Sequence, residues 1–210
     1  MINRKNIINL FLRLGVTLIV FSIFIIVSVF YGTSMPGESI KEDLAVLSED
    51  EILTKEKLSA HVFALSEEIG ERHYIEKGSL EQAANYIETS FRDMGLNPVS
   101  EIYSDKLYRN IVVNIYGRQR RDEIIVIGAH YDSVWLSPGA DDNASGVAAL
   151  LEIARGLREQ RFPKTIRFVA FANEEWPFFG RDNMGSRVNA KHSYDRNELI
   201  SGMISLEMLG

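Results

Sequence analysis

Three short polar segments of the sequence each follow an apolar stretch and carry residues that could bind metal ions or move protons. In the first segment, His130 and Asp132 are two residues apart, so their side chains share a face on an extended chain. A carboxylate beside a metal-binding histidine can hold its second ring nitrogen and fix the tautomer. A structural hydrogen-bonded pair is the commoner explanation of a lone His-x-Asp motif, so this motif alone does not establish a site.

The second segment, PGADDNASG over residues 138–146, leads into a predicted helix. Asp, Asn, Ser and Gly are common in turns and helix caps, which is the simpler interpretation of this segment. The alternative is a carboxylate, Asp141 or Asp142, held at the start of the helix where it could bridge two cations.

The third segment, Asn-Glu-Glu over residues 173–175, follows a buried apolar strand, and two adjacent acids cannot both point into an apolar core. Solvated loop acids explain this pair. Alternatively, one glutamate binds metal and the other accepts a proton. A further acid, Glu207, lies in the apolar stretch 199–208, where an unpaired charge would be costly.

Taken together, these segments predict a two-metal site of carboxylates and imidazole, which is much more specific than any one motif. The chain has no cysteine, which excludes thiol nucleophiles, Cys-ligated zinc and disulfides. Residues after 36 include 20 basic and 29 acidic ones, a net charge of −9. Such an acidic body argues against a nucleic-acid-binding protein.

The elements that must position these residues alternate between strands and helices. Strands are predicted over 110–116, 123–127, 165–172 and 199–208, and helices over 55–68, 79–94, 146–160 and 184–192. This alternation predicts an α/β domain with a buried, mostly parallel sheet, and ligands collect at the carboxyl ends of such strands. The GRQRRD turn predicts a hairpin between the first two strands. Ser79 and Gln82 predict a capping box.

The N-terminal part predicts a membrane anchor. Residues 14–31 carry no charge and are long enough to cross the hydrocarbon core, with basic residues before them and acidic residues after them. We therefore expect a cytoplasmic N-terminus (1–13), a transmembrane helix (14–31), a linker (32–50) and an extracytoplasmic domain (51–210). A cleaved signal peptide is the alternative.

On these motifs the chain resembles metallopeptidase family 28, the di-zinc aminopeptidases. The segments that carry the resemblance are GAHYDS (128–133), PGADDNASG (138–146), FANEE (171–175) and ISLEMLG (204–210), and the resemblance covers about residues 55–210. It implies a three-layer α/β/α sandwich with a mixed, mostly parallel sheet, as in other zinc peptidases.

The resemblance also implies the metal ligands. His130 and Glu207 would bind one zinc ion, Asp142 would bridge two, and Glu175 would bind the second. Glu207 stands where many relatives carry Asp, and Asp142 is preferred to Asp141 because the family varies the residue before the bridging Asp.

Two further residues would act in catalysis. Asp132 would orient His130, and Glu174 would be the general base, taking a proton from a metal-bridging water and passing it to the leaving amine.

The sequence departs from the family in one respect. The family's last ligand is a histidine beyond the ISLEMLG segment, and none of His61, His73 and His192 matches it, so we expect a C-terminally incomplete domain whose own peptidase activity is very low. The implied function is a membrane-anchored di-zinc aminopeptidase that acts on peptides. The alternatives are a catalytically silent binding ectodomain and a single-zinc glutaminyl cyclase. The WPFF segment (176–179) is either a wall of the substrate pocket or loop packing.

Overall fold

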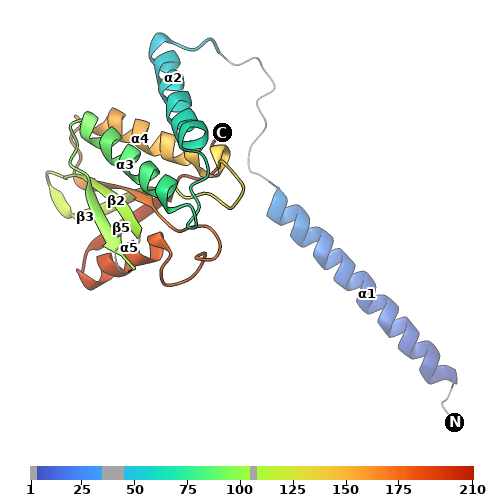
Figure 1. Ribbon diagram of the computed structural model, residues 1–210. Coiled ribbons are helices and arrows are strands. Elements are labelled where there is room, and N and C mark those ends of the chain that lie inside the picture. The colour runs from blue at the N-terminus through green and yellow to red at the C-terminus, as the bar shows by residue number, and fades with distance from the viewer. Residues whose placement is uncertain (1–3, 35–44, 105–107) are drawn as a thin grey trace. The chain divides into compact units, whose positions relative to one another are not determined.

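The computed structural model describes residues 4–34, 45–104 and 108–210, which belong to two units. The first unit contains α1 (Arg4–Thr33), whose segment Asn9–Thr33 has a mean hydropathy of 2.7 (Figure 1). At 1.5 Å per residue, this segment is long enough to cross a membrane. A membrane anchor and a signal sequence share these properties. Most of the predicted linker, residues 35–44, lies outside the described residues.

The second unit, Leu47–Gly210, is an α/β unit. Its elements are α2 (Glu49–Phe63), the short π-helical segment η1 (Ala64–Ile69), α3 (Lys77–Asp93), β1 (Val99–Tyr103), β2 (Tyr108–Ile115), β3 (Arg120–His130), the irregular segment η2 (Ala140–Ser145), α4 (Gly146–Leu157), β4 (Lys164–Phe171), α5 (Gly185–Asp195) and β5 (Leu199–Ser205).

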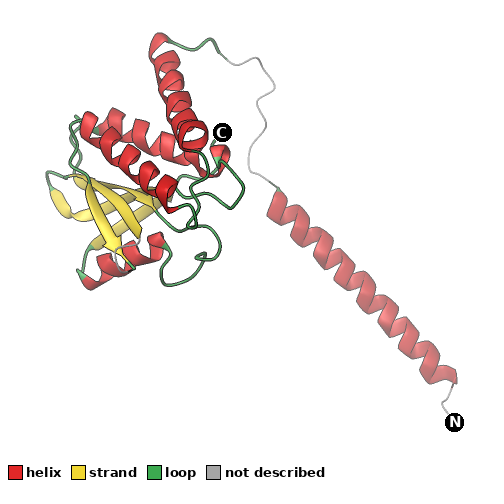
Figure 2. Ribbon diagram, in the orientation of Figure 1, coloured by secondary structure: helices red, strands yellow, loops and turns green. Residues whose placement is uncertain are grey.

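The five strands form one mixed sheet in the order β1-β2-β4-β3-β5. β4 and β5 both pair with β3 in parallel, whereas β2 is antiparallel to both of its neighbours. Helices α3 and α4 cover one face of the sheet and α5 lies on the other (Figures 1 and 2). The predicted three-layer α/β/α architecture is therefore confirmed.

The predicted hairpin between residues 110–116 and 123–127 is wrong. β4 lies between β2 and β3, so that Phe168 is paired with Val113 on one side and Ile127 on the other. β4 is buried along almost its whole length, and a central position covers both of its edges. β2 pairs instead with β1, a strand that the sequence analysis did not predict.

Two predicted helix starts are also wrong. α2 begins at Glu49, because Ser48 and Glu51 form a capping box in which the Ser48 backbone N–H donates to the Glu51 carboxylate at 2.7 Å. α3 begins at Lys77, and the Ser79 hydroxyl donates to backbone carbonyls instead of capping the helix. A capping box forms only where the side chains can reach the free backbone N–H groups at the start of the helix. The Ser-x-x-Gln pattern at residues 79–82 does not by itself place the side chains there.

The main apolar core lies between the sheet and the helices α3 and α4. Its fully buried members come from each of these layers: Ile87, Phe91, Ile111, Val147, Leu150, Leu151 and Phe168. A smaller cluster on the other face holds Ile124, Val126, Val169 and Phe171. β5 is exposed along its whole length, so the packing of the sheet is firmest around β3 and β4. His130 ends β3, and Glu174 and Glu175 follow β4.

A partly buried ion pair links β4 to Glu198, the residue before β5. The Arg167 guanidinium donates to the two carboxylate oxygens of Glu198 at 2.6 and 3.0 Å and to Asn114 Oδ1 at 3.0 Å. The hydrogen bonds from Arg167 lower the pKa of Glu198 to about 2, against a smaller opposing effect of burial. Because the folded-state pKa is depressed, this stabilisation is complete above the ordinary value near 4.5 and is lost as the pH falls towards 2.

We therefore expect Glu198→Gln to lower the free energy of unfolding by about 1–2 kcal/mol at pH 7. The variant should also lose much of the decline in stability that the wild-type chain shows between pH 4.5 and pH 2. Thermal unfolding over this pH range measures both effects. Glu159, an 83% exposed partner of Arg158, provides the control: Glu159→Gln should change stability by less than about 0.5 kcal/mol. Equal stability of the two variants would contradict the prediction.

Candidate active site

The site forms where the parallel strands β3 and β4 end side by side. His130, the last residue of β3, is in register with Phe171, the last residue of β4. Beyond them, the Asp132 carboxylate accepts the backbone N–H groups of Glu174 and Glu175, each at 3.0 Å. Asp132 therefore joins the two loops and sets the position of the glutamate pair relative to His130.

The buried imidazole of His130 lies at the centre of the site. Its Nε2 is 3.0 Å from Asp142 Oδ1, 3.0 Å from Glu207 Oε1 and 3.9 Å from Glu174 Oε2. Its Nδ1 faces Asp132 and lies 3.2 Å from the backbone oxygen of that residue and 3.4 Å from Oδ1. One ring nitrogen thus faces the predicted ligands, and the other is held by the predicted orienting residue.

Glu207 reaches the site differently from the prediction. It is not part of the apolar strand, because β5 ends at Ser205, and its side chain is 45% exposed. The Leu206 N–H donates to the Gly128 carbonyl at 2.8 Å, which extends the parallel pairing with β3 just beyond the strand. This register brings Glu207 beside His130 without burying an unpaired charge in the core.

Asn143 is a residue of the site that the sequence analysis treated only as part of a helix cap. It is fully buried, and its amide donates to the Leu206 carbonyl at 2.9 Å while its Oδ1 accepts the Met208 N–H at 3.2 Å. It thereby ties the segment that carries Asp142 to the segment that carries Glu207. No local pattern indicates this contact, because its partners lie more than 60 residues away.

Gly146 permits this close approach. A Cβ atom at this position would lie 2.5 Å from the Leu206 carbonyl oxygen and would also collide with the Asn143 side chain. Only glycine lets the start of α4 lie so near the segment after β5. Gly146, the last residue of the PGADDNASG segment, is therefore required by packing between two segments of the site.

His130, Asp142 and Glu207 form a group suited to a metal ion. Each offers one ligand atom, and these atoms all lie within 4.8 Å of one another. One imidazole and two carboxylates match the donor types of zinc, and three protein ligands are usual in catalytic zinc sites. Glu175 is outside this group, but its Oε1 is buried and has no hydrogen-bond partner among the described residues. The residues present fit zinc.

The electrostatics of the site also favour a bound cation. Burial opposes protonation of His130, but hydrogen bonds to Asp132 and Glu207 raise its pKa to about 11. Burial, together with the charge of Asp142, raises the pKa of Glu175 to about 7, and burial also raises the pKa of Glu174. Several carboxylates therefore share one imidazole, and a cation would offset their repulsion.

The residues that the sequence analysis considered but did not choose as ligands have other partners. His61 contacts Tyr86 at 2.6 Å and Glu152 at 3.2 Å, and His192 contacts Glu101 at 2.9 Å. Asp141, the rival to Asp142, lies outside the metal-binding group, and its Oδ1 accepts the backbone N–H of Gly210 at 3.2 Å.

The residues of the WPFF segment differ in their surroundings: one packs against other aromatic rings, and two others are exposed. Phe178 packs edge to face against Tyr74 and Tyr108, with ring centroids 5.2 and 5.4 Å apart. This packing anchors the loop after Glu175. Trp176 and Phe179 are 70% and 66% exposed and are free to line a surface beside the site.

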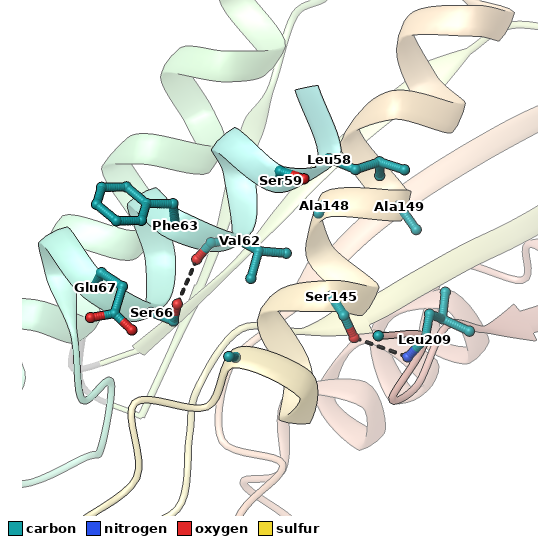
Figure 3. Close-up of a pocket in the computed structure, with 12 residues that line it drawn as sticks. Leu58, Ser59, Val62, Phe63, Ser66, Glu67, Ser145, Ala148, Ala149 and Leu209 are labelled. Atoms are coloured by element: carbon teal, nitrogen blue, oxygen red, sulfur yellow. Dashed lines mark hydrogen bonds between the residues drawn. The ribbon is translucent and has the colours of Figure 1, made fainter. Parts of the chain in front are cut away.

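An apolar cavity of about 630 Å³ lies apart from these residues, between α2 and α4 (Figure 3). Leu58, Val62 and Phe63 of α2 line it together with Ala148 of α4 and Leu209, whose N–H donates to the Ser145 hydroxyl at 2.9 Å. None of the six predicted site residues lines this cavity, so it is distinct from the candidate metal site.

Sequence comparison places this site in a known family. Residues 110–210, which hold all of the predicted site residues, match the model of peptidase family M28. The chain is 40% identical over 166 residues to the protein YfbL of Escherichia coli (strain K12), which covers 74% of this chain and 50% of YfbL. It is 38% identical over 91 residues to aminopeptidase YwaD of Bacillus subtilis (strain 168), covering 43% of this chain and 19% of YwaD.

Solved structures share the fold. BSAP, a zinc aminopeptidase from Bacillus subtilis, superposes with a TM-score of 0.64 at 17% identity, over 74% of this chain and 69% of BSAP. A glutaminyl cyclase from Bacteroides thetaiotaomicron superposes with a TM-score of 0.59 at 21% identity, over 80% and 64% of the two chains. The chain spans half the length of YfbL and less of YwaD. The family match over residues 110–210, supported by the sequence relatives, assigns this part of the chain to peptidase family M28.

Proposed function

We propose that the protein is a membrane-anchored di-zinc aminopeptidase that hydrolyses peptides outside the cytoplasm. The observation that carries the proposal is the convergence of His130, Asp142 and Glu207, with Glu174 3.9 Å from the same imidazole nitrogen. His130 and Glu207 would hold one zinc ion, Asp142 would bridge both ions, and Glu175 would hold the second. The proposed topology rests on the apolar helix α1 and the charges on either side of it.

The chemistry divides among the residues of the site. Bound zinc supplies a Lewis acid that polarises the scissile carbonyl and lowers the pKa of the attacking water. Glu174 accepts a proton from this water and donates it to the leaving amine, and its raised pKa suits a group that must both accept and release a proton. Asp132 holds His130 on one side and the Glu174 and Glu175 backbone on the other, so it orients ligand and base together.

The test combines metal analysis with matched substrates. The full chain, purified in detergent, is loaded with zinc, dialysed and assayed with an aminoacyl chromogenic substrate and with its N-acetylated form. We expect bound zinc and cleavage of the substrate with the free amine only, because an aminopeptidase must recognise that amine. A chain that binds no zinc would indicate a silent binding domain. One zinc per chain together with release of ammonia from an N-terminal glutamine peptide would indicate a glutaminyl cyclase.

A further inference from the structure

A buried arginine lies behind the candidate site. Arg72, in the connection between η1 and α3, is 0% exposed, and each of its guanidinium hydrogen bonds goes to a backbone carbonyl. Nε donates to Tyr131 at 2.7 Å, Nη1 to Leu65, Gly70 and Pro138 at 2.8, 3.0 and 2.6 Å, and Nη2 to Gly139 at 2.8 Å. This pattern uses the whole planar fork of the side chain.

Three of these carbonyls belong to the loop that joins His130 to Asp142. Tyr131 stands at the start of the loop, and Pro138 and Gly139 stand at its end, so one side chain holds both ends. Two further bonds join the Arg72 backbone to Ser133 of the loop: the Arg72 N–H donates to the Ser133 hydroxyl at 3.0 Å, and the Ser133 N–H donates to the Arg72 carbonyl at 3.3 Å.

The first residues of the loop, Tyr131 and Ser133, are buried, but its tip has little packing to hold it in place. Val134, Trp135 and Leu136 at its tip are 43%, 62% and 76% exposed, so they bury little apolar surface. Gly139 adopts a positive φ of +58°, and a Cβ atom there would lie 2.8 Å from Arg72 Nη2. The geometry of the loop end thus depends on the guanidinium and on the room that glycine leaves for it.

The charge of Arg72 is also matched to the site. Burial lowers its pKa to about 10, and the charges of Asp132 and Asp142 partly oppose this effect. Arg72 therefore stays protonated at neutral pH. Burying a cation is costly unless its donors are satisfied and opposite charge is near, and both conditions hold here.

We propose that Arg72 is a positioning residue that holds the loop between His130 and Asp142 in the geometry required for zinc binding. The inference rests on the metal site of the proposed function, and Arg72 itself touches neither metal nor substrate. It acts through the backbone of residues 131–139, which sets where the Asp142 carboxylate lies relative to the His130 imidazole.

The test measures the zinc dissociation constant of the full chain in detergent by chelator competition. We expect Arg72→Gln to weaken zinc binding by about 10–100-fold, the range found when partners of metal ligands are removed. The matched control is Arg167→Gln, which removes another buried arginine, bound to Glu198 instead of the loop. This variant should also lower stability, but should leave zinc affinity within about threefold of the wild-type value.

A second variant and a second measurement distinguish the loss of loop geometry from a general loss of the fold. Arg72→Lys keeps the charge, but its single ammonium cannot reach both ends of the loop, so zinc binding should remain about 10-fold weaker or more. Hydrogen exchange of the amides of residues 131–139 in zinc-free protein should be faster in both Arg72 variants than in Arg167→Gln. Wild-type zinc affinity in a folded Arg72 variant, or unchanged exchange in this loop, would overturn the inference. Absence of zinc binding by the wild-type chain would contradict the proposed function instead, and the exchange measurement would still decide whether Arg72 holds the loop.

Discussion

Replacing Glu174 by glutamine should lower the rate of peptide hydrolysis by about 10²–10⁴-fold while leaving zinc content nearly unchanged. The amide keeps the shape of the carboxylate but cannot accept the proton. Zinc content should persist because Glu174 is proposed as the base and not as a ligand, and it lies outside the group of metal-binding atoms formed by His130, Asp142 and Glu207. Metal analysis and kcat for an aminoacyl substrate, measured on the same preparation of the full-length protein, give both values.

The neighbouring glutamate is the matched control. Glu175→Gln has the same change of chemistry one residue away, and its backbone N–H is bound to the same Asp132 carboxylate. Because Glu175 is proposed as a zinc ligand, this variant should lose metal as well as activity. If Glu174→Gln lost zinc and Glu175→Gln retained it, the assignment of the pair would be reversed.

Asp142→Asn should weaken zinc binding by more than the roughly 10–100-fold that is typical of residues behind the ligands. Asp142 Oδ1 lies 3.0 Å from His130 Nε2, and asparagine removes the charge from the carboxylate proposed to bridge two ions. The loss should exceed that of any substitution that only reorients a ligand. Chelator competition measures the zinc dissociation constant, and circular dichroism checks that the fold is kept.

Asp141→Asn provides a control of identical chemistry in the adjacent position. The Asp141 carboxylate accepts the Gly210 N–H and lies outside the metal-binding group. The zinc affinity of the Asp141→Asn variant should therefore stay near the wild-type value. Similar losses in both variants would mean that general negative charge near the helix start matters. A loss in Asp141→Asn alone would exchange the two roles.

Much of the architecture could be predicted from the sequence, because burial imposes a periodicity on each element. The helices after residues 79 and 146 and the apolar strands around 127 and 168 have patterns set by which side chains face the core. The order of the strands could not be predicted in this way. GRQRRD has the composition of a hairpin turn, but whether β2 and β3 pair depends on β4, a segment about 40 residues later.

The candidate site was likewise predictable in part from the sequence. Residue types and spacing alone determined the chemistry: an imidazole beside a carboxylate, acids at strand ends and no cysteine are sufficient to predict a metal site of nitrogen and oxygen ligands. They also determined which residues to consider, since polar side chains after buried strands have few other places to go.

The family resemblance already favoured Asp142 over Asp141, but only the tertiary structure shows which side chain faces His130 and which residues support the site. Asp142 and not Asp141 faces His130, and Glu207 lies just after β5 instead of within it. Arg72 and Asn143 hold the site through backbone groups that are distant in the sequence. Such contacts leave no periodic pattern, because a backbone carbonyl is present at every residue and only the fold determines which of them a buried side chain can reach.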